Sequence, residues 1–115
     1  MACCHHYIET ASGDAGFTID MSRITFGRGV MSALGDRAKA LGMTRIGLFT
    51  DPRLKALEPV TRALESIRKA GLDVDVYDEI LVEPDSVSVM KAAKWVEEGN
   101  FDGFVSVGGG SVMDT

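Results

Sequence analysis

Hydrophobic residues follow two different spacings along this chain. Short apolar runs rich in β-branched residues, at 45–50, 72–77 and 104–107, are typical of buried strands. Three other segments carry apolar residues at every third or fourth position, which is the period of an amphipathic helix. The expected buried helix faces are Val30, Leu34, Ala38 and Leu41 in the first; Val60, Ala63, Leu64 and Ile67 in the second; Val89, Met90, Ala93 and Val96 in the third.

Start and stop signals bound the predicted helices. Pro59 is well placed to open the second helix, and Asp85 or Ser86 to cap the third. Strands separated by helices of this length predict βαβ crossovers. The fold class is therefore α/β, with a Rossmann-like parallel sheet and helices on both faces. In such a sheet, ligands bind at the carboxyl ends of the strands.

The N-terminal part of the chain gives weaker signals. Residues 17–21 and 23–27 alternate apolar and polar positions, which predicts a hairpin or a bent edge strand. We interpret residues 1–16 as a flexible N-terminus and residues 17–115 as one nucleotide-binding α/β domain, incomplete at its C-terminus. Cys3-Cys4-His5-His6 holds four metal-binding side chains, but four consecutive residues cannot all face one tetrahedral centre. We expect no metal site there.

A strand followed by three glycines is the strongest functional signal. The apolar run 104–107, read as a strand buried on both faces, leads directly into Gly108, Gly109 and Gly110. Residues without a Cβ let a ligand approach the main chain closely, at a cost in backbone entropy. A tight turn with no ligand is the alternative, but three glycines in a row favour a nucleotide pyrophosphate site.

A helix is predicted to start directly after these glycines. Ser111 and Asp114 have the three-residue spacing of a capping box. The free N–H groups and positive dipole end of a helix N-terminus suit a phosphate. We therefore predict that Ser111 and Asp114 join the three glycines in binding a cofactor.

Asp51 follows the first buried strand and should lie at the same edge of the sheet as the glycines. A carboxylate there can accept hydrogen bonds from the ribose of NAD, and it would repel the 2′-phosphate of NADP. The simpler interpretation is a turn residue before Pro52. The position of Asp51 relative to the glycines favours the ribose role.

Composition and charge narrow the function classes. The chain has 115 residues and a net charge of −5, and its basic residues are scattered rather than grouped in a stripe. This argues against binding to nucleic acid or to an anionic membrane. No apolar run approaches the ~18 residues of a membrane span, and the first basic residue is Arg23, unlike a signal or transit peptide. The two cysteines are adjacent, and we expect a reducing, cytoplasmic location.

Several motifs, in order, resemble the iron-containing (group III) alcohol dehydrogenase family over about residues 17–115. The start of the chain with its Cys and His residues, Tyr77-Asp78, the Glu-Pro step and the glycine motif ending in Asp-Thr most resemble its hydroxyacid–oxoacid transhydrogenase branch. The motifs are Ile24-Thr-Phe-Gly-Arg-Gly29, Phe49-Thr-Asp51, Val82-Glu-Pro84 and Phe101-Asp-Gly-Phe-Val-Ser-Val-Gly-Gly-Gly-Ser-Val-Met-Asp-Thr115.

The resemblance implies the nucleotide-binding part of a dehydroquinate synthase-like fold, and an oxidoreductase. Members of the branch oxidise 4-hydroxybutyrate to succinate semialdehyde and reduce 2-oxoglutarate to 2-hydroxyglutarate, with NAD carrying the hydride. The family's iron or zinc ligands lie in a later helical domain, so none is assigned to this chain and it should be inactive alone. Animal members of the branch are mitochondrial, which is the alternative location.

Three alternatives remain from the sequence. The first is an iron-type alcohol dehydrogenase acting on another small substrate. The second is a free-standing α/β binding module, such as a receiver domain, but that class needs an acidic pair and a late lysine, of which only Asp51 is present. The third is a structural domain that forms homodimers through its N-terminal strands.

Overall fold

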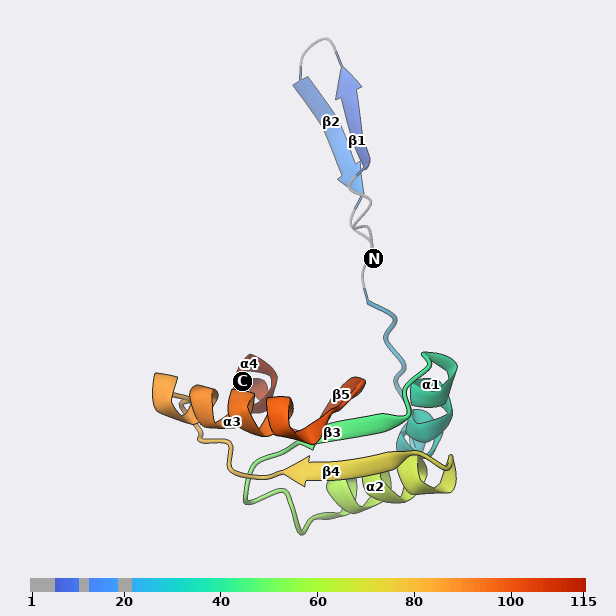
Figure 1. The fold of residues 1–115 in the computed structure, drawn as a ribbon. Helices are drawn as coiled ribbons and strands as arrows, with labels where there is room; N and C mark the ends of the chain where they lie inside the picture. Colours follow the sequence, from blue (N-terminus) through green and yellow to red (C-terminus); the bar gives the residue numbers. More distant parts are fainter. Residues whose placement is uncertain (1–5, 11–12, 19–21) are drawn as a thin grey trace.

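A three-stranded parallel sheet forms the centre of the computed structural model, which describes residues 6–10, 13–18 and 22–115 (Figure 1). Strand β3 (Arg45–Phe49) lies between β4 (Asp73–Tyr77) and β5 (Gly103–Ser106). Both strand pairs are parallel, and in register Phe49 faces Tyr77 on one side and Ser106 on the other. The carboxyl ends of all three strands therefore meet at one edge.

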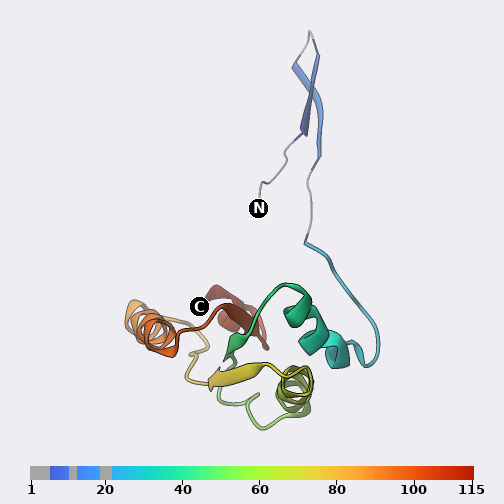
Figure 2. The same ribbon diagram turned by 45° about the vertical axis from the view of Figure 1, so that its right-hand side comes forward.

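Helices cover both faces of this sheet (Figures 1 and 2). The 3₁₀ helix η1 (Val30–Ala33), α1 (Leu34–Ala40) and α2 (Glu58–Lys69) lie on one face. Helices α3 (Ser86–Gly99) and α4 (Gly110–Asp114) lie on the other. The predicted α/β class, with a parallel sheet between helices, is confirmed.

Alternation along β3 creates two cores. Ile46 and Leu48 are fully buried under α1 and α2, while Phe49 points to the α3 side. The first core consists of Ala38, Ile46, Leu48, Val60, Ala63, Ile67, Leu72 and Val107. The second consists of Tyr77, Ile80, Ala92 and Val112, with Phe49 and Trp95 packed against it.

The strand order makes β3 the point at which the sheet reverses. The chain crosses through α2 to β4 on one side of β3, then through α3 to β5 on the other side. In doubly wound sheets, such a reversal opens a crevice between the carboxyl ends of two neighbouring strands. Here the reversal point lies between the ends of β3 and β5.

From Val30 onward, the predicted strands and helices are confirmed within about two residues at their ends, and so is the buried face of α2. The first predicted face is right at Leu34 and Ala38, but Val30 is 40% and Leu41 75% exposed.

The face predicted for α3 is wrong for most of its residues, since Val89 and Ala93 are exposed and Met90 is 69% exposed. In α3 the buried residue is Ala92, with Trp95 half-buried beside it. The Trp95 ring lies 5.5 Å from the ring of Phe49, so this aromatic contact rather than the aliphatic stripe sets the rotation of α3.

Strand β5 also differs from the prediction. It was predicted to be buried on both faces, but of its four residues only Gly103 is buried, and Phe104 is 47% exposed. Among the three strands β5 lies at the edge, where fewer side chains cover it. An apolar run of this length cannot tell an edge strand from a central one, because strand order is set by the crossovers.

The N-terminal strands lie earlier than the sequence predicts. Strands β1 (His6–Thr10) and β2 (Gly13–Thr18) form an antiparallel hairpin where a flexible terminus was expected. Figure 1 shows this hairpin apart from the α/β body. The strand predicted at 23–27 is wrong, since residues 22–26 form no regular element. Residues 19–21 of the other predicted strand, and Cys3, Cys4 and His5, lie outside the described residues.

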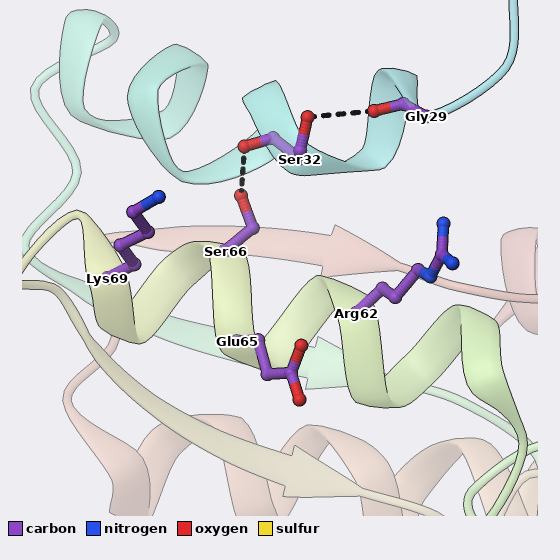
Figure 3. Close-up of a pocket in the computed structure, with 6 residues that line it drawn as sticks. All are labelled: Gly29, Ser32, Arg62, Glu65, Ser66 and Lys69. Carbon is purple, nitrogen blue, oxygen red and sulfur yellow. Dashed lines mark hydrogen bonds between the residues drawn. The ribbon is translucent and has the colours of Figure 1, made fainter.

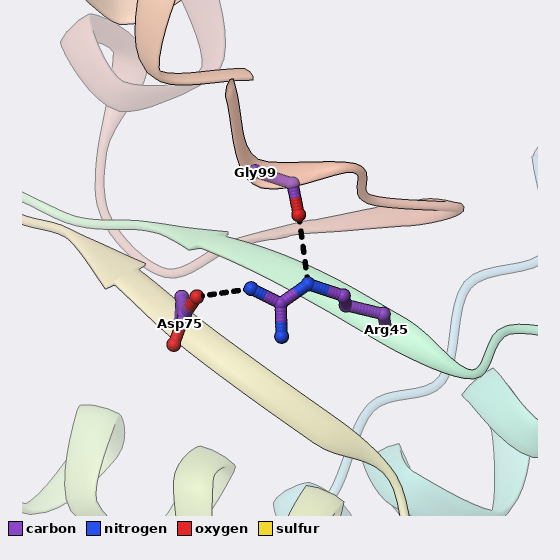
Figure 4. Close-up of polar contacts among 3 residues, drawn as sticks. All are labelled: Arg45, Asp75 and Gly99. Carbon is purple, nitrogen blue, oxygen red and sulfur yellow. Dashed lines mark hydrogen bonds and ion pairs between the residues drawn. The ribbon is translucent and has the colours of Figure 1, made fainter. Parts of the chain in front are cut away.

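Arg45, the first residue of β3, links this strand to β4 and to the end of α3 (Figure 4). Its Nε donates to the carbonyl of Gly99 at 2.7 Å, and its terminal nitrogen pairs with Asp75 at 2.6 Å. The guanidinium also lies 5.2 Å from the centre of the Phe101 ring. This edge of the sheet is thus closed by structural contacts.

Asp102 closes the same edge from the β5 side. Its carboxylate accepts the Thr44 hydroxyl and the N–H groups of Thr44 and Arg45, the latter two at 2.9 Å. The Thr44 hydroxyl, followed by these N–H groups, holds the pKa of Asp102 below its ordinary value.

Of the helices that the structure describes, none is long and apolar enough to cross a membrane.

Candidate functional site

The carboxyl ends of the strands are joined through Thr50, the residue after β3. Its N–H donates to the carbonyl of Tyr77 at 2.9 Å, which links it to β4. Its fully buried hydroxyl donates to the carbonyl of Val107 at 2.9 Å, which links it to β5. The N–H of Val107 also donates to the carbonyl of Phe49, the last residue of β3. From the sequence alone, Thr50 is only the middle residue of the motif Phe49-Thr-Asp51 and has no role of its own.

Asp51 lies at this edge, as predicted, and forms part of a turn. One carboxylate oxygen accepts the N–H groups of Arg53 at 2.8 Å and Leu54 at 2.9 Å. The other oxygen accepts no hydrogen bond from the described part of the chain. Asp51 is half-buried, so this second oxygen has an acceptor position to offer. The geometry therefore combines the turn role with room for a ligand contact.

The three glycines serve two different purposes. A Cβ on Gly108 would lie 2.9 Å from the Cβ of the buried Val112 and still nearer its Cγ2. By contrast, a Cβ on Gly109 or Gly110 would meet no heavy atom within 4 Å. None of the three has a positive φ. Gly108 is thus required by packing, whereas Gly109 and Gly110 present open backbone.

The predicted capping box at Ser111 and Asp114 is wrong. Helix α4 begins at Gly110, with Gly109 at the N-cap in an extended conformation and no side chain capping the helix. Ser111 and Asp114 both lie inside this short helix. The Ser111 hydroxyl donates to the carbonyl of Val82, in the loop between β4 and α3, and Asp114 is exposed.

The helix that does carry a capping box is α3. The N–H of Ser88 donates to Asp85 at 2.7 Å, and the N–H of Asp85 donates to the Ser88 hydroxyl at 3.0 Å. Hydrogen bonds from Ser88, first from its N–H and then from its side chain, hold the pKa of Asp85 below its ordinary value. The sequence prediction of Asp85 as a cap is confirmed.

Two pockets lie beside the carboxyl ends of the strands. One of about 440 Å³ lies beside the glycine turn and the other, of about 570 Å³, beyond the end of β4. The first is lined by Met31, Leu34, Leu54, Pro59, Val105, Ser106, Val107 and Gly108. The second is lined by Pro52, Asp78, Glu79, Leu81, Asp85, Val87, Ser88 and Lys91.

Ion pairs hold the loop that borders the second pocket. Asp78 pairs with Lys55 at 2.5 Å, which connects the loops after β3 and β4. Glu79 pairs with Lys91 of α3 and raises the pKa of that lysine. Together with the Ser111 hydroxyl bond, these contacts fasten the three loops of the carboxyl edge to one another.

A separate pocket of about 350 Å³ lies between η1 and α2 (Figure 3). Ser66 on its wall accepts the N–H of Gly35 at 2.9 Å and donates to the carbonyl of Ser32 at 2.8 Å. Arg62 pairs with Glu58 at 2.5 Å. These polar groups serve the packing of the helices, and none of the predicted site residues lines this pocket.

The described residues contain no group of three or more His, Cys, Asp and Glu side chains placed to hold a metal ion. Only the backbone of His6 is described. The part of the chain seen here therefore does not fit the metal of an iron-type dehydrogenase, whereas the open Gly109–Gly110 backbone fits a bound phosphate group.

Known proteins share both the sequence and the fold. The family model for iron-containing alcohol dehydrogenase matches residues 21–115. The mitochondrial hydroxyacid-oxoacid transhydrogenase of Pongo abelii is 40% identical over 102 residues, which are 89% of this chain and 22% of that protein. This chain thus spans under a quarter of that relative's length.

Two solved structures share the arrangement. A 1,3-propanediol oxidoreductase superposes with a TM-score of 0.74 at 31% identity, over 77% of this chain and 23% of its own. A sulfoacetaldehyde reductase from Bifidobacterium kashiwanohense, solved with NAD+, superposes with a TM-score of 0.70 at 25% identity, over 86% of this chain and 27% of its own. The chain belongs to the iron-containing alcohol dehydrogenase family.

Proposed function

We propose that this chain is the NAD-binding part of a metal-dependent oxidoreductase. The observation that carries the proposal is the open backbone of Gly109 and Gly110 at the reversal point of the sheet. In doubly wound sheets, ligands bind at this position. Backbone N–H groups without side chains beside them allow close approach of a pyrophosphate.

Three further residues complete the proposed cofactor site. Gly108 shapes the turn through its packing on Val112. The Ser111 hydroxyl is bonded to Val82, so its contribution is to fasten the turn to the neighbouring loop. Asp114 is exposed in the same helix, and its proposed contact is with a hydroxyl group of the cofactor, because a carboxylate would repel the phosphates.

Asp51 is proposed to favour NAD over NADP. Its second carboxylate oxygen is the acceptor for a ribose hydroxyl, while its first remains in the turn. A charged acceptor strengthens this hydrogen bond, and its negative charge disfavours the 2′-phosphate of NADP. The sulfoacetaldehyde reductase with NAD+ supports the choice of cofactor.

The proposed reaction of the whole protein is that of hydroxyacid-oxoacid transhydrogenase, with 4-hydroxybutyrate and 2-oxoglutarate as substrates. The 40% identity to the Pongo abelii protein supports this assignment over other alcohol dehydrogenases. Bound NAD would carry the hydride between the two substrates. No step is assigned to iron or zinc, since the described residues offer no site for either. The name of that relative also favours a mitochondrial over a cytoplasmic location.

Cofactor titration tests the proposal. The 115-residue chain is titrated calorimetrically with NAD, ADP-ribose and adenosine. ADP-ribose retains the pyrophosphate, so we expect it to bind about as tightly as NAD, and adenosine at least about tenfold more weakly. Equal affinity for adenosine and ADP-ribose would contradict a pyrophosphate site. The third sequence alternative, a purely structural domain dimerising through β1 and β2, predicts no binding of any of the three.

A further inference from the structure

Thr50 is one of two polar residues buried in the described part of the chain, and the proposed function assigns it no task. The other is Ser66 of α2, whose hydroxyl contacts Gly35 of α1 and Ser32 of η1. Burying a hydroxyl is unfavourable unless it is hydrogen-bonded. The partner that Thr50 has found is the carbonyl of Val107, 57 residues away in sequence.

The position of this bond sets it apart from ordinary packing. The register between β3 and β5 ends at the pair Phe49–Ser106. Beyond it the β3 chain turns away through Asp51, whose backbone and side chain bond forward to Leu54. Where the backbone hydrogen bonds between the strands end, the Thr50 hydroxyl donates to the carbonyl of Val107, the last residue before Gly108.

The glycines themselves cannot fix where the turn lies. Gly109 and Gly110 have no side chains, and in the described part of the chain a Cβ on either would meet no heavy atom within 4 Å, so no neighbouring side chain fixes them from that side. The turn is held at its flanks. Before it, the carbonyl of Val107 accepts the Thr50 hydroxyl and the N–H of Val107 donates to Phe49; after it, the Ser111 hydroxyl donates to Val82. An anion site made of backbone N–H groups depends on where those groups point.

We infer that Thr50 is a positioning residue for the cofactor site: its hydroxyl bond to Val107 fixes the backbone of the glycine turn that is proposed to bind the pyrophosphate. This rests on the proposed function. Thr50 does not touch the cofactor and acts only through the Val107 carbonyl. The bond adds nothing to the affinity of a ligand that does not use the turn.

The test compares three variants of the full chain. Thr50→Val keeps the shape and removes the hydroxyl, and Thr50→Ser keeps the hydroxyl and removes a methyl group. Ser66→Ala removes the other buried hydroxyl, away from the turn, and serves as the matched control for a general loss of stability. Folding is checked by circular dichroism and thermal unfolding, NAD affinity by calorimetry, and the exchange rates of the amides of 108–110 by NMR.

We expect Thr50→Val to bind NAD about three- to tenfold more weakly, the effect of one ordinary hydrogen bond, and to exchange the glycine-turn amides faster. Thr50→Ser should restore both properties. Ser66→Ala should unfold at a lower temperature yet bind NAD like the wild type.

Two results would overturn the inference while leaving the proposed function intact. One is wild-type NAD affinity in folded Thr50→Val. The other is equal loss of affinity in Thr50→Val and Ser66→Ala, which would reduce the effect to stability. A wild-type chain that binds no NAD would instead overturn the proposed function and, with it, the role of Thr50.

Discussion

Replacing Gly110 by valine tests whether a ligand binds against the exposed backbone of the glycine turn. Gly110 lies in the first turn of α4 with no positive φ, and a Cβ there would meet no heavy atom within 4 Å. The backbone strain that a side chain meets at positive φ is therefore absent. We expect Gly110→Val to change the free energy of unfolding by less than about 1 kcal/mol.

The effect on the cofactor should be larger. If the pyrophosphate lies against the backbone of Gly109 and Gly110, the valine side chain occupies its place. NAD affinity should then fall by at least about tenfold, or about 1.4 kcal/mol. Gly110→Ala should lower the NAD affinity by a smaller factor. Its fold should be slightly more stable than the wild type, because glycine is a poor helix residue.

Gly108→Ala is the matched control. Its Cβ would lie 2.9 Å from the Cβ of the buried Val112, so the fold should lose about 1–3 kcal/mol through overpacking. Urea unfolding and NAD titration on the same samples separate the two effects. A folded Gly110→Val protein that binds NAD with wild-type affinity would refute the pyrophosphate assignment.

Three substitutions and one assay of the unchanged chain have defined outcomes. Asp51→Asn keeps a turn acceptor but removes the charge, so NAD affinity should fall by about 1.5–3 kcal/mol and NADP affinity should rise; titrations unchanged for both cofactors would leave Asp51 only a turn residue. Asp85→Ala removes the α3 cap and should lower the free energy of unfolding by about 1 kcal/mol, whereas a urea midpoint equal to wild type would rule out a capping contribution. The pKa of Asp102 is lowered in the folded state, so the stabilisation by its carboxylate is present above about pH 4 and is lost as the pH falls through that lowered value. Over this acid range, the free energy of unfolding of Asp102→Asn, measured with urea, should change less than that of the wild type. Parallel pH profiles of the two proteins would contradict this. The chain alone, assayed with NAD, iron or zinc, and 4-hydroxybutyrate, should show no turnover, and sustained turnover free of contaminating enzyme would disprove this.

The sequence predicts the α/β sheet and its crossovers well, because the apolar periods of strands and helices differ clearly. It also places Asp51 at the correct edge of the sheet. It fails for the burial of Met90 and Phe104, since helix rotation depends on Trp95 packing against Phe49, and the position of β5 depends on strand order. Both are tertiary properties that no local window of residues contains.

The site follows the same division. The three glycines identify the turn from sequence alone, but the separate role of Gly108 appears only when Val112 is seen behind it. Ser111 and Asp114 have the spacing of a capping box, yet α4 begins at Gly110 and leaves both inside the helix. Thr50 belongs to the motif Phe49-Thr-Asp51, but its hydrogen bond has no local signal, because its partner Val107 is distant in sequence.

Mapping NAD onto the chain by NMR is the most direct test of the proposed cofactor site. Amide shifts of the isotopically labelled 115-residue protein are followed during a titration with NAD. We expect the largest shifts in residues 108–111 and at Asp51, with smaller shifts around Gly29 and Arg62, in the pocket between η1 and α2. Shifts centred on that pocket, or no shifts at millimolar NAD, would contradict the assignment of the glycine turn as the NAD site.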